Sequence, residues 1–160
     1  MAKPKQAPKR SAPTLRPDAA SALAVDLGWH SRLAARRISG ELDRGLAAAG
    51  ISSSQFGLMC LIAAAADDTL GALAQQAGLN QSTMSRNVDQ LVRAGWVEVA
   101  TVEADRRRRA VWLTEAGARR LQQALPLWRA AQRGLAARLG ATLSPQLLAV
   151  TARLGPSHQE

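Results

Sequence analysis

The stretch from residue 69 to residue 114 constrains the fold of this chain more than any other. In its first half, Gly78 and Asn80 separate two short segments whose apolar residues recur at helical spacing, and Gly95 follows the second segment. Gly78 suits a turn that needs a positive φ, and Asn80 can cap the second helix with its side chain. Two short helices joined by a glycine-containing turn are typical of a helix-turn-helix.

The second half of this stretch predicts a β-hairpin. Residues 96–101 and 109–113 alternate in polarity and carry β-branched or aromatic side chains, which is the pattern of two paired strands. The tip between them, residues 105–109, is an aspartate followed by four consecutive arginines. Such a run repels itself, so we expect a bound anion to relieve it, and the narrow minor groove of DNA attracts inserted arginine. A solvated charged loop is the alternative. The whole pattern predicts a winged helix-turn-helix at residues 51–114.

The rest of the chain is predicted to be helical, apart from a basic, proline-rich tail. Residues 1–18 contain few apolar side chains and predict disorder. Apolar spacing predicts a long first helix at residues 19–48 and a buried helix at about 53 to 66. Ser52 and Gln55 form the pattern of a capping box at the start of the buried helix.

A long C-terminal helix should follow the hairpin. Thr114 can cap it, Pro126 should kink it before it ends at about residue 139, and Ser144 and Pro145 predict the start of a last helix. We expect one mainly α domain at residues 19–155. The helices at 19–48 and 115–154 have more apolar surface than a small winged-helix core can cover, which predicts dimerisation through them.

The candidate DNA-binding residues lie on the second helix of the helix-turn-helix and on the wing. Met84, Val88 and Leu91 are spaced to face the core, which leaves the polar side chains of this helix outside. Arg86 can pair with a guanine edge or a phosphate, and Gln81 can read adenine. The short hydroxyl side chains suit phosphate contacts. The full set of candidates is Gln81, Ser82, Thr83, Ser85, Arg86, Asp105, Arg106, Arg107 and Arg108.

Composition favours a nucleic-acid partner and disfavours an enzyme. The formal net charge of +9 favours a polyanion. With one cysteine, Cys60, the chain has no intrachain disulfide or thiolate zinc site. We expect no enzymatic activity, metal or cofactor, because the chain shows no catalytic triad order, metal-ligand spacing or phosphate loop. The sequence shows no signal peptide, and its longest apolar run, residues 56–66, is too short to cross a bilayer, so we expect a cytoplasmic protein.

The chain resembles the MarR family of transcriptional regulators over about residues 20 to 154. The resemblance rests on residues 52–58, 73–79, 81–91, 95–97 and 105–117, and its specific part is an Asp-x-Arg wing followed by Val-x-Leu-Thr-x-x-Gly. It implies a homodimer that binds pseudo-palindromic promoter DNA, with residues 82–86 in the major groove. Arg107, held by Asp105, would enter the minor groove. Many members are repressors that release DNA when they bind a small, often aromatic, anionic molecule, whereas others sense oxidants through cysteine.

Several features leave the mode of regulation open. Trp29 and His30 lie together on the first helix, where an aromatic anion could stack and pair, but packing at a dimer seam would also explain them. A thiol-based oxidant sensor that uses Cys60 is an alternative, although a mid-helix cysteine among apolar residues behaves as a small hydrophobe. Val99 and Ala100 stand where many relatives have basic residues, so the wing base should make fewer DNA contacts. A DNA-binding architectural protein that responds to no ligand is the other alternative.

Overall fold

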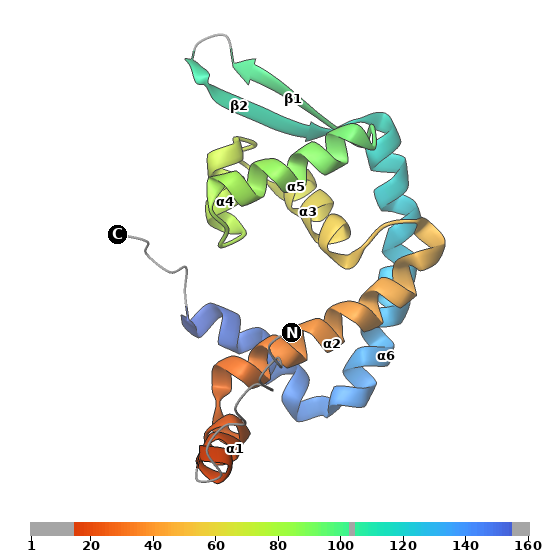
Figure 1. The fold of residues 1–160 in the computed structure, drawn as a ribbon. Coiled ribbons are helices and arrows are strands. Elements are labelled where there is room, and N and C mark those ends of the chain that lie inside the picture. Colours follow the sequence, from red (N-terminus) through yellow and green to blue (C-terminus); the bar gives the residue numbers. More distant parts are fainter. Residues whose placement is uncertain (1–14, 103–104, 155–160) are drawn as a thin grey trace, which may run out of the picture. The chain divides into compact units, whose positions relative to one another are not determined.

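A computed structural model describes the backbone of residues 15–102 and 105–154, and the side chains of these residues except 102, 105–108, 151 and 152. The predicted disordered tail therefore lies outside the described residues up to position 14. The chain divides into two units, residues 1–37 and 38–160. The helices and the hairpin are labelled in Figure 1.

The N-terminal unit contains α1 (Leu15–Val25) and the first half of α2 (Leu27–Leu46). Two predictions were wrong here. Residues 15–18 are helical rather than disordered, since Pro17 falls in the first turn of α1, where its missing N–H is tolerated. The predicted single helix at 19–48 is interrupted at Asp26, whose carboxylate accepts the backbone N–H of Trp29 and so caps α2.

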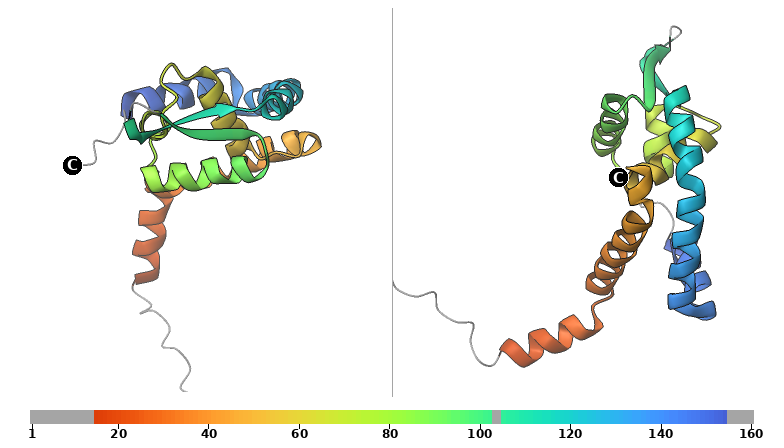
Figure 2. Two further views of the ribbon diagram at one scale, coloured as in Figure 1. Left: turned by 90° about the horizontal axis from the view of Figure 1, so that it is seen from above. Right: turned by 90° about the vertical axis from the view of Figure 1, so that its right-hand side faces the viewer.

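The second unit holds the remaining elements in the order expected for a winged helix. After α2 come the 3-10 turn η1 (Ala47–Ala49), α3 (Ser53–Ala64), α4 (Leu70–Gln76), α5 (Gln81–Arg93), β1 (Val97–Val102), β2 (Asp105–Leu113) and α6 (Glu115–Leu154). Figures 1 and 2 show α3, α4 and α5 gathered beside the hairpin, with α5 running along it.

One apolar core joins these elements. Its fully buried large side chains come from the end of α2, from α3, α4 and α5, and from both strands: Leu46, Met59, Leu73, Met84, Val88, Leu91, Val97 and Val111. Trp128 of α6 stacks on Phe56 of α3, with ring centroids 5.4 Å apart. This core fixes α5 and the hairpin as one body.

The predicted capping box at the start of α3 is confirmed. The Ser52 hydroxyl accepts the N–H of Gln55 at 3.2 Å, and the Gln55 side-chain oxygen accepts the N–H of Ser52 at 2.9 Å. The reciprocal bonds satisfy two of the free N–H groups at this helix end. The helix ends at Ala64, slightly before the predicted boundary.

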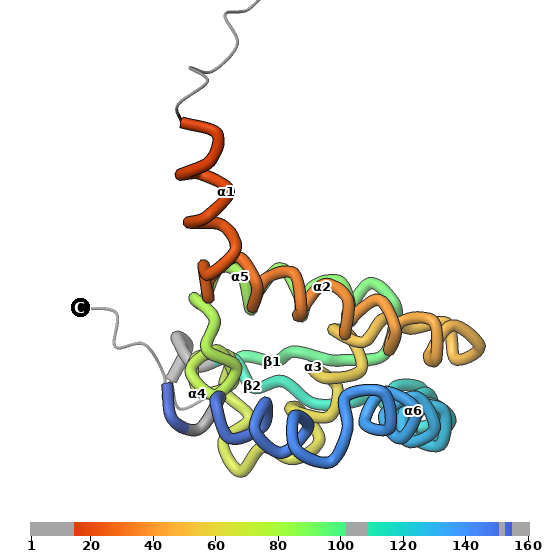
Figure 3. Tube along the Cα trace, turned by 90° about the horizontal axis from the view of Figure 1, so that it is seen from below, coloured from red at the N-terminus to blue at the C-terminus, as the bar shows by residue number. Residues whose placement is uncertain are grey.

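The predicted pair of strands is confirmed, but the prediction that residues 105–109 form the tip was wrong, because strand pairing extends to Asp105 and these residues belong to β2. The hairpin is tied to the loop before α4. The antiparallel register pairs Val97 with Leu113, and a bulge follows Thr101. Figure 3 shows the two strands side by side. The N–H of Val111 donates to the carbonyl of Asp68 at 2.9 Å, so the wing is attached to the helix-turn-helix independently of its own turn.

The predicted end of the long helix at about residue 139 is confirmed by a break in α6 at Gly140, whereas the kink predicted at Pro126 is not seen in the backbone angles. The backbone of α6 stays helical through Pro126, and the non-helical residue is Gly140, with φ 80° and ψ 168°. The prediction that Ser144 caps a last helix was wrong, because its hydroxyl donates back to the carbonyl of Ala136 at 3.4 Å. Figure 1 shows α6 changing direction toward its C-terminal end.

Candidate nucleic-acid interface

The turn between α4 and α5 has the geometry that the sequence predicts. Gly78 has a φ of 63°. The N–H of Leu79 donates to the carbonyl of Ala74 at 2.9 Å, and that of Gly78 donates to Gln75 at 3.1 Å. This is a Schellman ending, which uses the otherwise unpaired carbonyls of the last turn of α4. The chain is thereby reversed within a few residues, and α5 starts at once.

Asn80 caps α5 as predicted, and it also engages one candidate DNA contact. Its side-chain oxygen accepts the N–H of Thr83 at 2.8 Å and the hydroxyl of Ser82 at 2.9 Å. The Ser82 hydroxyl is thus oriented at the N-terminal end of α5, where the helix dipole favours an anion such as a phosphate.

The two faces of α5 separate as the spacing predicts. Met84, Val88 and Leu91 are at most 1% exposed. On the opposite face, Gln81, Ser82 and Arg86 are exposed, while Thr83 and Ser85 are half-buried. Arg86 forms no ion pair with any residue whose side chain the structure describes. Its guanidinium is therefore available for a base edge or a phosphate.

The predicted wing residues lie on strand β2, and their side chains lie outside the described set. The backbone of Asp105, Arg106, Arg107 and Arg108 belongs to β2, with Asp105 opposite Val102. The predicted ion pair between Asp105 and Arg107 and the minor-groove contact of Arg107 stay predictions. Arg109, the next arginine along the strand, is exposed.

The predicted ligand residues Trp29 and His30 lie in the first turn of α2. The Trp29 side chain is 40% exposed. A ring nitrogen of His30 lies 3.2 Å from the carbonyl of Ala24, so this imidazole already has a partner inside the N-terminal unit. Their role in ligand binding stays a prediction.

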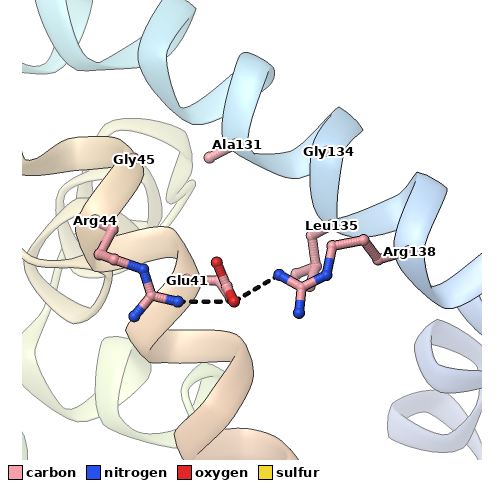
Figure 4. Close-up of a pocket in the computed structure, with 7 residues that line it drawn as sticks. All are labelled: Glu41, Arg44, Gly45, Ala131, Gly134, Leu135 and Arg138. Atoms are coloured by element: carbon pink, nitrogen blue, oxygen red, sulfur yellow. Dashed lines mark hydrogen bonds and ion pairs between the residues drawn. The ribbon is translucent and has the colours of Figure 1, made fainter.

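A pocket that the sequence analysis missed lies between the last turns of α2 and the middle of α6. Its volume is about 410 Å³, and Figure 4 shows its lining residues. The Glu41 carboxylate bridges two arginines, with Arg44 at 2.7 Å and Arg138 at 2.5 Å. Hydrogen bonds from Arg138 and then Arg44 hold the pKa of Glu41 below its ordinary value. Gly45 lets the two helices approach here, since a Cβ on it would lie 2.4 Å from that of Ala131.

Cys60 lies half-buried in α3. Burial raises the pKa of its thiol, which disfavours the thiolate that reacts with oxidants.

The residues that the structure describes include no metal-binding cluster and no single helix that could span a membrane. No three His, Cys, Asp or Glu side chains among these residues are grouped to hold a metal ion. Within the same residues, no single helix has the length and apolar character needed to span a membrane, although the bent pair 27–49 and 53–64 has both when taken together.

These features define the class of protein. A helix-turn-helix whose second helix is capped and has a polar outer face, followed by a β-hairpin wing, is the fold of winged-helix DNA-binding proteins. A family model described as MarR family matches residues 49–108. A search of curated proteins gave no significant match.

Solved structures of transcriptional regulators share this fold. The M. tuberculosis regulator MosR in complex with DNA has a TM-score of 0.73 and 32% identity, covering 81% of this chain and 93% of that one. A mutant MarR from E. coli complexed with operator DNA has a TM-score of 0.73 and 25% identity, covering 83% and 96%. The S. aureus MepR–DNA complex, at 18% identity, shows the same fold with a TM-score of 0.68, covering 81% and 96%.

The chain belongs to the MarR family of transcriptional regulators. It is a DNA-binding regulator, and its mainly α fold with a two-stranded wing is the winged helix-turn-helix of that family.

Proposed function

We propose that this protein is a cytoplasmic, homodimeric repressor that binds a pseudo-palindromic promoter site and leaves it when a small ligand binds. The observation that carries the proposal is the arrangement of α5. Met84, Val88 and Leu91 anchor one face in the core, and Gln81, Ser82 and Arg86 stand exposed on the other. The second helix of a helix-turn-helix reads the major groove with such residues.

Specific and nonspecific contacts should be divided among the candidate residues. Arg86 and Gln81 would read base edges, and the hydroxyls of Ser82, Thr83 and Ser85 would fix the register on phosphates. To donate to a phosphate, Ser82 would exchange its hydrogen bond to Asn80 for the new one. Arg107, positioned by Asp105, would enter the minor groove beside the site, with Arg106 and Arg108 adding charge. The net charge of +9 supports a large phosphate contribution to affinity.

Exposed apolar side chains at both ends of the described chain support the dimer. Trp29, Leu23 and Leu27 are at least 40% exposed in the N-terminal unit, and Leu148 and Leu154 are 72% and 80% exposed at the end of α6. Apolar patches of this kind mark interfaces. A second copy of the chain would cover them and would give two reading helices for two half-sites.

The ligand proposal rests on the two candidate places described above. Trp29 offers an exposed ring for stacking, and the pocket lined by Glu41, Arg44 and Arg138 offers volume. Both arginines of the pocket are already paired with Glu41, so an anionic ligand there would have to compete with this carboxylate. The raised pKa of the Cys60 thiol gives no support to oxidant sensing.

The test is fluorescence anisotropy on the promoter fragment upstream of the protein's own gene, with a shuffled duplex as the control, across a salt series. We expect tight binding to the native fragment that weakens steeply with salt, and weaker binding to the shuffled duplex. Two results together would contradict a sequence-specific repressor and favour an architectural role. They are equal binding to both duplexes and a selection from random DNA that enriches no particular sequence.

A further inference from the structure

The end of the recognition helix α5 is joined to the start of α6 by several short contacts. Gly95, with a φ of 73°, and Trp96 complete a Schellman ending in which the N–H of Trp96 donates to the carbonyl of Leu91 at 3.0 Å. The Thr114 hydroxyl donates to the carbonyl of Gly95 at 2.8 Å, and the N–H of Thr114 donates to that of Trp96 at 3.0 Å. Figure 1 shows the end of α5, the start of β1 and the start of α6 meeting at this corner.

At this corner the first turn of α6 lies so close to the chain after α5 that position 117 has no room for a side chain. A Cβ at Gly117 would lie 1.9 Å from the carbonyl oxygen of Trp96. The first turn of α6 therefore rests directly on the backbone that ends α5. A displacement of the start of α6 has to move this backbone too, because close-packed contacts do not deform freely.

Arg120 adds a third element to this corner. Its guanidinium carbon lies 5.5 Å from the centre of the Trp96 ring, a cation–π contact. One of its nitrogens donates to the carbonyl of Ala49 at 2.8 Å. Ala49 is the last residue of η1, the turn through which α2 enters the winged helix. A single side chain of α6 thus contacts both the turn that follows the recognition helix α5 and the turn η1 that follows α2.

We propose that Arg120 is a positioning residue that holds the recognition helix at a fixed placement relative to α6, and thereby sets the spacing of the two half-sites that a dimer reads. The inference rests on the proposed function, in which α2 and α6 build the dimer and each copy presents one α5. Arg120 contacts the chain just after the C-terminal end of α5, whereas the base-reading residues lie near its capped N-terminal end. Arg120 would therefore affect the position of the recognition helix and would not contact bases.

The experiment uses the full-length dimer and a duplex that the wild-type protein selects from random DNA. Binding is measured to the full site, to a single half-site, and to full sites whose half-sites are moved apart or together by one base pair. Arg120→Gln is compared with Arg119→Gln. Arg119 is the matched control, because it has the same charge on the same helix, its side chain is 59% exposed, and among the side chains that the structure describes it pairs with Glu115 alone, one turn away.

We expect Arg120→Gln to lose about tenfold in affinity for the full site, within the range of a typical coupling between sites. It should keep its half-site affinity, and it should no longer distinguish the native spacing from the altered ones. Arg119→Gln should keep the spacing preference. Arg120→Lys, which retains a cation and a donor toward Ala49, should restore part of it.

The size of the dimer and its thermal midpoint are followed for every variant. If Arg120→Gln lowers the folded fraction, two other variants give the same comparison. Trp96→Leu removes the ring that Arg120 contacts, and Arg120→Lys keeps a donor for the Ala49 carbonyl. Equal losses on the full site and the half-site, or an unchanged spacing preference, would overturn the proposal. A wild-type protein that binds the full site no better than the half-site would instead overturn the proposed dimeric function, and this inference with it.

Discussion

At the scale of single residues, Gly117 shows how the absence of a side chain positions the reading unit. Glycine inside a helix costs about 1 kcal/mol relative to alanine, yet α6 has one in its first turn, and its N–H donates to the capping hydroxyl of Thr114 at 3.0 Å. The residue is buried against the Trp96 carbonyl. Close backbone approach, rather than flexibility, explains why glycine stands there.

We predict that Gly117→Ala destabilises the protein by about 1–3 kcal/mol, the usual cost of overpacking, because the new methyl group would meet the Trp96 carbonyl oxygen. Gly134→Ala is the matched control, since a Cβ there meets nothing within 4 Å, and it should stabilise the protein by up to about 1 kcal/mol. Urea unfolding followed by circular dichroism measures both. A Gly117→Ala variant as stable as the wild type would contradict the close approach.

Glu41 gives a pH-dependent prediction. Its pKa is lowered by Arg138 and Arg44, so its stabilising effect is complete above its unfolded pKa and is lost as the pH falls through its lower folded value. We expect Glu41→Gln to be less stable than the wild type at pH 7, and the difference should shrink below about pH 4.5, the ordinary value for this group. Thermal midpoints across pH 3–7 test this, with Glu98→Gln as a control for net charge. A difference that stays constant over this range would show that the carboxylate pairing contributes nothing.

At the scale of elements, local signals predicted the helix-turn-helix well. Asn80 and Ser52 each accept the N–H of the residue three positions later, as capping patterns require. Gly78 and Gly95 have the positive φ values expected of helix-ending glycines. Each of these features depends on neighbouring residues alone, so the sequence is sufficient to predict it.

The errors have a different origin, because they depend on competition between two local signals. The apolar spacing at residues 19–48 predicts one helix that runs through Asp26, although the carboxylate of Asp26 caps a new helix there. Near the C-terminus, Ser144 and Pro145 resemble a helix start, but Gly140 breaks the backbone earlier. The contacts of Arg120 with Ala49 and Trp96 join residues far apart in sequence, and no local pattern predicts them.

The positions of the two arginines on α5 predict that Arg86 contributes to DNA binding more than Arg93 does. Arg86→Ala should lose about 1 to 3 kcal/mol of binding energy and should relax the base preference at one position of each half-site. Arg93→Ala is the matched control, because this exposed arginine lies in the last turn of the same helix, away from its capped start. Competition binding against single-base variants of the selected site gives both quantities. Equal losses on specific and random DNA would mean that Arg86 contacts only phosphate.

At the scale of the whole molecule, the proposed function requires two copies of the chain, because one α5 reads one half-site. The core buries the side chains that attach α5 and the wing to α3 and α6. Beyond Gly140, by contrast, Leu143, Leu147 and Leu148 stay at least 40% exposed in the single chain. Leucines at this spacing on a helix would form an apolar surface that water does not favour. A second copy of the chain could cover this surface with its own identical surface, as in a two-fold symmetric dimer.

Leu148→Glu should therefore weaken the dimer. Leu148 is 72% exposed in the single chain, so the substitution costs little in the monomer, whereas an unpaired carboxylate buried at an interface is strongly unfavourable. We expect sedimentation equilibrium to show a dimer dissociation constant raised at least about a hundredfold, equivalent to about 2.7 kcal/mol. Val92→Glu is the control, because Val92 is 40% exposed on α5, outside the proposed interface, and its variant should stay dimeric. The Leu148→Glu monomer should bind full site and half-site equally, since it presents one reading helix. A variant that stays dimeric at the same concentrations would show that the C-terminal segment of α6 does not form the interface.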